Sequence, residues 1–322
     1  MKKQIIPVFF TIDEGYAPYL SIAVASLIEN ASKDSEYHIH IIYENITLET
    51  MEKLKKLETE YAKIILEEMK TGLESITNRK ENLLRTDFFT LTIYYRIFIP
   101  FMFPEYDKAI YIDSDTCIPG DISKLYNIPL KDNLFAGCID ISCKDNPVLC
   151  NYFKMNSGVS IDEYINSGVL LMNMKELRRI NFEKHFLYLL NKYHFDTVCP
   201  DQDYINAMAY KKILHLSNEW NAMPTNGAYK IENPSIIHYN LFFKPWHYNS
   251  IDYEEYFWKY VEKSLFKEEI IKEKENFTKE MQANDQKTLD NLVARAEEIA
   301  HSDKTFKNVF EHTDEKRLED NL

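Results

Sequence analysis

Glycine is scarce in this sequence, with 7 residues among 322. None of the glycines belongs to a GxGxxG or a GxxxxGK[ST] pattern. In those patterns the glycines let the backbone approach the phosphates of a bound nucleotide closely. The sequence therefore excludes phosphate-binding loops of the Rossmann and P-loop types.

Paired cysteines and long apolar runs are also missing. The five cysteines form no CxxC pair, and their odd number indicates free thiols in a reducing cytosol. No apolar run reaches the length of a transmembrane helix. The opening MKKQIIPVFFTIDEGY is similar to a signal peptide, but its short apolar part is broken by Pro7 and runs into Asp13 and Glu14, which indicates a first β-strand. We expect a cytoplasmic protein without a transmembrane segment, and a place at the inner face of the membrane is compatible with this.

Positive charge is in deficit, since the formal net charge is -13. A general nucleic-acid partner is therefore excluded, because such a partner requires a basic face. The hydrophobic content of 45% and the aromatic content of 14% predict a well-packed globule. An acidic protein that handles phosphates is expected to do so at one local site, with a metal ion to offset the charge.

Strand-like and helix-like segments alternate along the chain, which predicts an α/β fold with a mostly parallel central sheet. The expected strands are residues 4–12, 38–46, 62–69, 107–113, 133–140 and 165–174. The expected helices are residues 19–32, 47–61 and a segment from 90 that Pro100 stops. Ligands of such sheets bind beyond the carboxyl ends of the strands. Four carboxylates follow strand-like runs and should gather on that rim: Asp13, Asp113, Asp115 and Asp140.

The character of the sequence changes after residue 250. Residues 263–322 contain no glycine or proline and mix charges of both signs with scattered apolar side chains. This pattern predicts a helical C-terminal extension over 251–322, behind a main domain over 1–250. We expect a solvated two-helix appendage. Packing on the domain, homodimer formation and contact with a membrane surface all stay open for it.

Asp113 and Asp115 stand side by side in AIYIDSDT, and three kinds of chemistry use such a pair. A calcium loop of the EF-hand kind requires glycine and glutamate where this chain has Ile118 and Lys124, which excludes it. A phosphatase of the haloacid-dehalogenase type would use Asp113 as nucleophile and Asp115 as general acid. That motif normally lies on the first strand, whereas here it follows more than 100 residues, so the phosphatase is kept only as an alternative.

The third chemistry is a metal site for a diphosphate. Two carboxylates on one short loop offer the oxygen ligands that Mn²⁺ or Mg²⁺ prefers. Downstream, IIHYNLFFKPWHY supplies His238 as a third ligand and Lys244 as a point charge for a phosphate. Pro245 and Trp246 are expected to fix this segment.

Seven segments in order resemble glycosyltransferase family 8, over roughly residues 4 to 250. They are FFTIDEGYAPYL, TIYYRIFIP, AIYIDSDT, YINSGVLLMNM, CPDQDYINAM, NEWNAMPTN and HYNLFFKPWH. The resemblance implies a GT-A type fold, which is a Rossmann-like, mostly parallel sheet flanked by helices. It also implies a retaining hexosyltransferase that uses a UDP-sugar, with Mn²⁺ or Mg²⁺ as cofactor.

The resemblance also implies roles for individual residues. The nucleotide-sugar would be bound by Thr11, Asp13, Tyr16, Arg96, Asp113, Ser114, Lys244 and Trp246. The metal ligands would be Asp113, Asp115 and His238. The residues at the reactive sugar would be Asn166, Asp201 and Gln202. A cap for the helix that follows stays open for the Asp201–Gln202 pair, and a structural ion pair stays open for Arg96.

The implied reaction moves glucose or galactose from UDP to a hydroxyl of a glycan or glycosylated protein. Retention through a covalent glycosyl-enzyme and retention by same-face substitution are both conceivable, and we expect the second. One departure from the family is Leu241, which stands where a glycine is usual three residues after the metal histidine. A degenerate, non-catalytic protein that binds UDP-sugars is a further alternative. It predicts loss of metal ligands, yet Asp113, Asp115 and His238 are all present.

Overall fold

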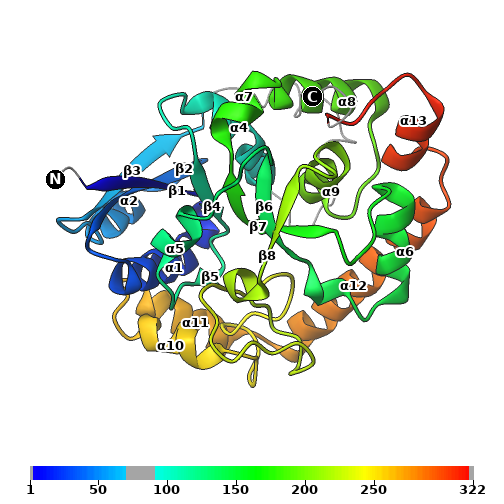
Figure 1. Cartoon of the computed structure of the whole chain (residues 1–322). Coiled ribbons are helices and arrows are strands. Elements are labelled where there is room, and N and C mark those ends of the chain that lie inside the picture. The colour runs from blue at the N-terminus through cyan, green and yellow to red at the C-terminus, as the bar shows by residue number, and fades with distance from the viewer. Residues whose placement is uncertain (1–2, 70–90, 319–322) are drawn as a thin grey trace.

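A central β-sheet with helices on both sides forms the body of the protein (Figure 1). The computed structural model describes residues 3–69 and 91–318. Within these residues seven strands form the sheet in the order β3-β2-β1-β4-β7-β6-β8. Their bounds are β1 (Gln4–Ile12), β2 (Ser35–Tyr43), β3 (Ala62–Glu68), β4 (Ala109–Ile112), β6 (Phe135–Ile139), β7 (Ile165–Met172) and β8 (Ile213–Leu216). A separate two-stranded ribbon pairs β5 (Thr116–Cys117) with β9 (Ile237–His238).

Two apolar clusters cover the two faces of this sheet. Alternate side chains of β1 point to opposite faces, so Val8 and Phe10 join one cluster and Phe9 joins the other. Burial on both faces explains why the sequences of the strands are nearly continuous apolar runs.

The helices of the described residues are α1 (Ala17–Asn30), α2 (Leu48–Lys55), α4 (Tyr95–Met102), α5 (Ile122–Tyr126), α6 (Pro147–Asn156), α7 (Met174–Arg179), α8 (Phe182–Tyr193), α9 (Pro200–Met208), α10 (Glu254–Val261), α11 (Lys267–Asn276), α12 (Lys279–Ala300) and α13 (Phe306–His312).

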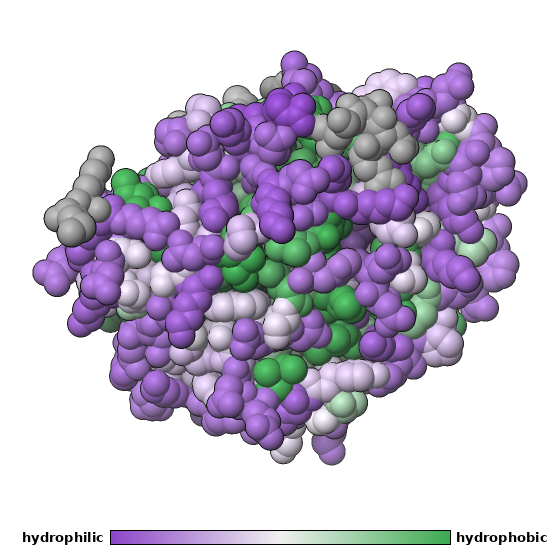
Figure 2. Space-filling model, in the orientation of Figure 1, coloured by the Kyte–Doolittle hydropathy of each residue, from purple (hydrophilic) through white to green (hydrophobic). Residues whose placement is uncertain are grey.

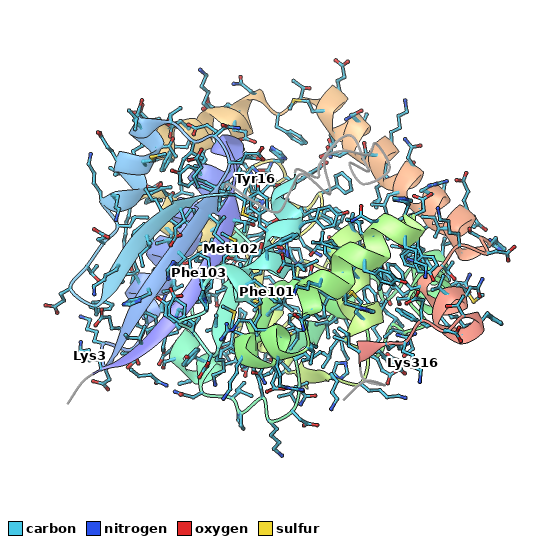
Figure 3. The ribbon with its side chains drawn as sticks, turned by 90° about the horizontal axis from the view of Figure 1, so that it is seen from above. Lys3, Tyr16, Phe101, Met102, Phe103 and Lys316 are labelled. Atoms are coloured by element: carbon cyan, nitrogen blue, oxygen red, sulfur yellow. The ribbon has the colours of Figure 1, made fainter. Side chains whose placement is uncertain are left out.

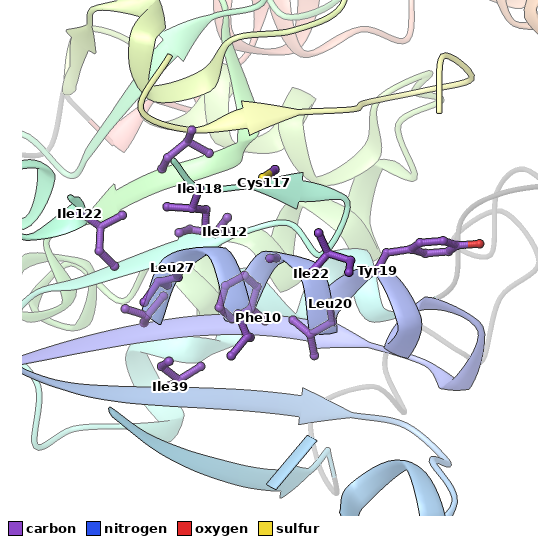
Figure 4. Packing of buried hydrophobic residues seen from close by; sticks show 14 of the residues in the cluster. Phe10, Tyr19, Leu20, Ile22, Leu27, Ile39, Ile112, Cys117, Ile118 and Ile122 are labelled. Atoms are coloured by element: carbon purple, nitrogen blue, oxygen red, sulfur yellow. The ribbon is translucent and has the colours of Figure 1, made fainter. Parts of the chain in front are cut away.

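The βαβαβ order expected for the first 70 residues is confirmed where the structure describes them. β1 pairs in parallel with β2, and β2 pairs in parallel with β3. The Asp13 side chain caps the short 3₁₀ turn that leads into α1 by accepting a hydrogen bond from the Tyr16 amide at 3.1 Å. Pro18 in the first turn has its φ already set for a helix. Figure 4 shows the apolar side chains of α1 packed against Phe10 of β1.

Strand β7 runs opposite to its neighbours, which makes the sheet mixed. It pairs antiparallel with both β4 and β6. Its first residues therefore lie at the edge where β1, β4 and β6 end. Asn166 is the second residue of β7, inside the strand expected over 165–174. The reversed direction of the strand brings Asn166 to the predicted rim.

Helix α4 does not stop at Pro100, contrary to the expectation. Pro100 lies inside the helix, which continues to Met102. A proline lacks the amide hydrogen that would bond one turn back, and this shortens helices without preventing a further half turn. The Pro100 carbonyl accepts a hydrogen bond from Nη1 of Arg178 at 2.9 Å, which anchors this end of the helix to α7.

The C-terminal segment is helical as expected, but it is not a solvated pair of helices. Its four helices, α10 to α13, pack on the rest of the chain. Phe257 of α10 and Ile270 of α11 belong to the same cluster as β1. Ile299 of α12 joins a cluster with Tyr152 of α6. The hydrophobic core therefore continues past residue 250.

Lys3 directly precedes β1 and Tyr16 follows its carboxyl end, and both residues are labelled in Figure 3. The face shown in Figure 2 is mostly hydrophilic, with hydrophobic side chains gathered near its middle. Across residues 3–69 and 91–318, none of the helices combines the length and apolar character that crossing a membrane requires.

Candidate active site

A cavity of about 540 Å³ opens at the edge of the sheet where β1, β4 and β6 end. The four carboxylates expected on this rim, those of Asp13, Asp113, Asp115 and Asp140, all line it. So do most of the other predicted site residues, namely Thr11, Tyr16, Arg96, Ser114, Asn166, Asp201, Gln202, His238 and Lys244. Trp246 does not line the cavity. The structure thus brings together residues that are up to 233 positions apart (Thr11 to Lys244).

Asp113, Asp115 and His238 converge in this cavity. One ligand atom from each lies within 4.8 Å of those of the other two. The ribbon of β5 and β9 sets this geometry, because it pairs Thr116 with His238 directly beside the aspartates. Ser114 turns away from the cluster and donates a hydrogen bond to the Thr11 carbonyl at 2.9 Å. The two flanking carboxylates are thereby left facing the histidine.

This cluster fits a divalent cation such as Mn²⁺ or Mg²⁺. Two carboxylates and an imidazole are a suitable donor set for it. His238 Nδ1 lies 3.1 Å from Asn221 Oδ1, so Nδ1 carries the proton and Nε2 faces the carboxylates with its lone pair. Gly168 leaves the necessary room, since a Cβ there would lie 2.2 Å from His238 Cε1. No role for Asn221 was predicted from the sequence, although the residue stands within the NEWNAMPTN segment.

Arg96 is a buried cation that connects two parts of the cavity. Its Nη2 donates to Asp113 Oδ1 at 2.9 Å, and its Nε lies 3.1 Å from Asp201 Oδ2. Burial acts to lower the pKa of Arg96, but the charges of Asp113 and Asp201 outweigh it and raise that pKa. The ion pair that stayed open for Arg96 exists, and it lies inside the site.

Lys244 is buried beside the metal cluster. Its Nζ donates to Asp115 and to the Tyr239 carbonyl. Burial acts to raise the pKa of Asp115, but the charge of Lys244 is the main effect that opposes it, and that pKa lies well below its usual range. Asp115 is therefore an anion near neutral pH, as a metal ligand must be.

Trp246 supports the site from behind. Its side chain is only 2% exposed and stacks on the Tyr19 ring with centroids 3.8 Å apart. Direct contact with a nucleotide-sugar, which was expected for Trp246, does not agree with this burial. His247, the next residue, is held by Glu273 of α11 at 2.7 Å. The tryptophan and α11 thus fix the segment that carries Lys244.

A hydrogen-bonded network lies beyond the metal cluster, around the start of β7 and of α9. Asp140 Oδ2 accepts from Asn166 Nδ2 at 3.0 Å and from Gln202 Nε2 at 3.1 Å. Gln202 Oε1 accepts from the Ser167 amide at 2.9 Å, and the Ser167 hydroxyl donates to Asp201 at 2.8 Å. Asp140 was expected on the rim without a role, and it proves to be the centre of this network.

The cap that stayed open for the Asp201–Gln202 pair is not found. The residue that precedes α9 is Cys199, and no side chain caps the helix there. Asp201 and Gln202 lie in the first turn, where negative charge is favoured by the helix dipole. Burial raises the pKa of Asp201, and the charge of Arg96 opposes this rise. Asp203 is structural, since it accepts hydrogen bonds from the buried Tyr152 and Tyr164 hydroxyls at 2.5 and 2.6 Å.

Comparison with solved structures identifies the fold as GT-A. The galactosyltransferase LgtC, solved with donor and acceptor sugar analogues, matches with a TM-score of 0.69 and 22% identity, over 81% of this chain and 96% of that chain. WbbM, a bifunctional glycosyltransferase, has the same TM-score and identity, over 86% of this chain and 53% of its own.

Sequence comparison gives the family. The model of Glycosyl transferase family 8 matches residues 7–250, so this chain belongs to that family. A putative glycosyltransferase of Haemophilus influenzae is 27% identical over 69% of this chain and 65% of its own length. A lipopolysaccharide 1,2-glucosyltransferase of Escherichia coli is 28% identical over 78% of this chain and 77% of its own length. The chain thus spans slightly less than two thirds of the Haemophilus relative.

Proposed function

We propose that this protein is a metal-dependent, retaining glycosyltransferase. It moves glucose or galactose from a UDP-sugar to a hydroxyl of a glycan or glycosylated protein. The observation that carries this proposal is the convergence of Asp113, Asp115 and His238 in one cavity of a family 8 chain. Lys244, buried against Asp115, adds a positive charge on the diphosphate side.

The order of the strands supports one orientation of the donor in the cavity, with its uridine near β1 and its sugar near β7. Thr11, Asp13 and Tyr16 lie at the end of β1 and are proposed to hold the uridine. A divalent cation, when bound at the cluster, supplies Lewis-acid stabilisation of the leaving diphosphate. The sugar would then lie beside β7, where Asn166 and Gln202 are held by Asp140.

Same-face substitution is the proposed course of retention. A covalent course requires a free carboxylate nucleophile next to the sugar. Asp201 Oδ2 is engaged by Arg96 at 3.1 Å and by the Ser167 hydroxyl at 2.8 Å, which makes it a poor nucleophile. Asp201 and Gln202 are therefore proposed to stabilise positive charge on the sugar. Detection of a glycosyl adduct on Asp201 by mass spectrometry would favour the covalent course.

Release of UDP tests the proposal. UDP-glucose and UDP-galactose should each be tried with Mn²⁺, with Mg²⁺ and with a chelator. We expect release with at least one donor, its loss on chelation, and its loss in Asp115→Ala. Thermal shift measurements with the same nucleotides should show stabilisation that requires the metal. If no uridine nucleotide stabilises the protein, the proposal is wrong.

Two other functions would give different results in activity and binding assays. A phosphatase that uses Asp113 as nucleophile would release phosphate from a simple phosphomonoester, and UDP would not affect that release. A non-catalytic protein would bind UDP-sugars without turnover. Both are disfavoured by the Arg96–Asp113 bond and by the convergence of Asp113 with Asp115 and His238, which support a ligand role for Asp113.

We also propose a cytoplasmic location, and a position at the inner face of the membrane is compatible with it. It is supported by the five free cysteines. A homodimer through the C-terminal helices remains a prediction, and sedimentation of the purified protein would test it. Since α10 and α11 pack against α1 of their own chain, only their outward surfaces would take part.

A further inference from the structure

One wall of the cavity comes from α12, a helix beyond the segment that matches the family. Thr288, Asn291, Leu292 and Arg295 line the cavity. Their spacing of three, four and seven residues places them on one face of the helix. The family match ends at residue 250, so this wall lies outside the matched segment.

The position of α12 places this wall on the side away from the proposed uridine site. In the sheet, β1 lies two strands away from β7, while β6 lies next to β7 on its other side. Helix α6 follows β6 in the chain, and α12 packs on α6 (Figure 1). The α12 wall thus lies on the far side of Asn166 and Gln202, where a sugar acceptor would have to enter.

Two contacts fasten α12 across the cavity. In its first half, Asp285 accepts a hydrogen bond from the Tyr248 hydroxyl at 2.8 Å. In its second half, Arg295 forms an ion pair with Asp196, and it forms another with Glu298 of the same helix. These contacts fix the orientation of the lining face. They also leave the Arg295 charge neutralised by two carboxylates.

The remaining groups on the face are neutral. Within the part of the chain that the structure describes, the side chains of Thr288 and Asn291 make no hydrogen bond. Leu292 adds an apolar surface between them and Arg295. A hydroxyl, an amide and an apolar patch suit a sugar ring, which has hydroxyls at its edge and an apolar face. An anionic acceptor would find no unpaired cation on this face.

We propose that the Thr288–Asn291–Leu292 face of α12 binds the acceptor and selects a neutral sugar over an anionic one. This inference rests on the proposed function. Asn291 and Leu292 are thus specificity-determining residues for the acceptor and do not take part in donor binding.

The test measures UDP release from the UDP-sugar with Mn²⁺, first with water alone and then with an added sugar. Lactose and methyl glucosides serve as neutral probes, and glucose 6-phosphate and glucuronate serve as anionic probes. We expect the neutral probes to raise the release above hydrolysis. In Asn291→Ala and Leu292→Ala the ratio of this increment to hydrolysis should fall by about tenfold, the effect of one lost contact. Asn284→Ala, an exposed position on α12 outside the cavity, should keep the wild-type ratio.

The outcomes separate the two proposals. If UDP neither binds nor is released, the proposed function is wrong and this inference fails with it. If water releases UDP but no neutral probe raises the rate, the inference alone is overturned. The same holds if an anionic probe raises the rate more than the neutral ones, or if both α12 variants keep the wild-type ratio.

Discussion

The Nε atom of Arg96 lies 3.1 Å from the carboxylate of Asp201, and both side chains are almost fully buried. The same guanidinium donates to Asp113, which belongs to the metal cluster. Arg96 therefore fixes the distance between the Asp113 carboxylate and the first turn of α9, which carries Asp201. A lysine has no planar fork and holds one such partner at a time.

Arg96→Met should destabilise the protein by about 3–5 kcal/mol, because it leaves the buried Asp201 and the half-buried Asp113 without their shared cation. Arg96→Lys keeps the charge and should retain more of the stability, but UDP release should fall by roughly 100-fold as the alignment is lost. Urea unfolding and UDP release measure the two effects. An Arg96→Met variant as stable as wild type would contradict this view of the ion pair.

Gly168→Ala should weaken metal binding. A Cβ at this position would lie 2.2 Å from His238 Cε1 and 2.7 Å from Asp113 Oδ2, so at least one ligand must move. We expect Mn²⁺ affinity, measured by calorimetry with UDP present, to fall by at least about tenfold. Gly227→Ala is the control, since its Cβ would meet nothing within 4 Å but its φ of +82° makes alanine strained. It should lose stability and keep Mn²⁺ affinity. Equal affinities for both variants would contradict the prediction.

The sequence was sufficient to predict the rim of carboxylates and the convergence of Asp113, Asp115 and His238, because both depend on where apolar runs end and on a series of motifs. It was not sufficient for the direction of β7. That strand is buried on both faces, and an apolar run reads the same in either direction. The α12 wall was missed because its polar side chains have the spacing of an ordinary solvated face. Trp246 was misplaced because adjacency to Lys244 in sequence does not fix the direction of a side chain in a turn.

Leu241 stands where the resemblance to the family implied a glycine, and it adopts a backbone that suits glycine. Its φ is +52°, in the left-handed region, and the side chain is 39% exposed. Leu241 thus has the left-handed backbone conformation that glycine adopts most readily.

Leu241→Gly should raise the free energy of unfolding by about 0.5–1 kcal/mol. The relief of left-handed strain, about 1–2 kcal/mol, exceeds the added freedom of glycine in the unfolded chain. Asn226→Gly is the control, because Asn226 also has a φ of +52° but asparagine tolerates this region. Urea unfolding should show a smaller gain there. A loss of stability in Leu241→Gly would contradict the presence of strain.

His40 gives the stability a dependence on pH. The side chain is buried in β2, stacks on Phe9 with ring centroids 4.6 Å apart, and contacts Glu67 and Tyr106 at 3.2 and 3.1 Å. Burial, assisted by the charge of His38, lowers the pKa of His40 from 6.5 to about 4. Between these two values the unfolded chain binds a proton at His40 that the folded protein does not bind. Stability should therefore fall as the pH falls from 6.5 to about 4, and His40 has no such effect above this range.

His40→Gln should reduce this loss. Between about pH 7 and about pH 5 the wild type should lose about 2 kcal/mol more stability than the variant. The measurement is the free energy of unfolding in urea at both pH values, and the quantity compared is the difference between them. His301→Gln, which alters an exposed histidine, should lose as much as wild type. If His40→Gln loses as much stability as wild type, His40 is not the group that titrates.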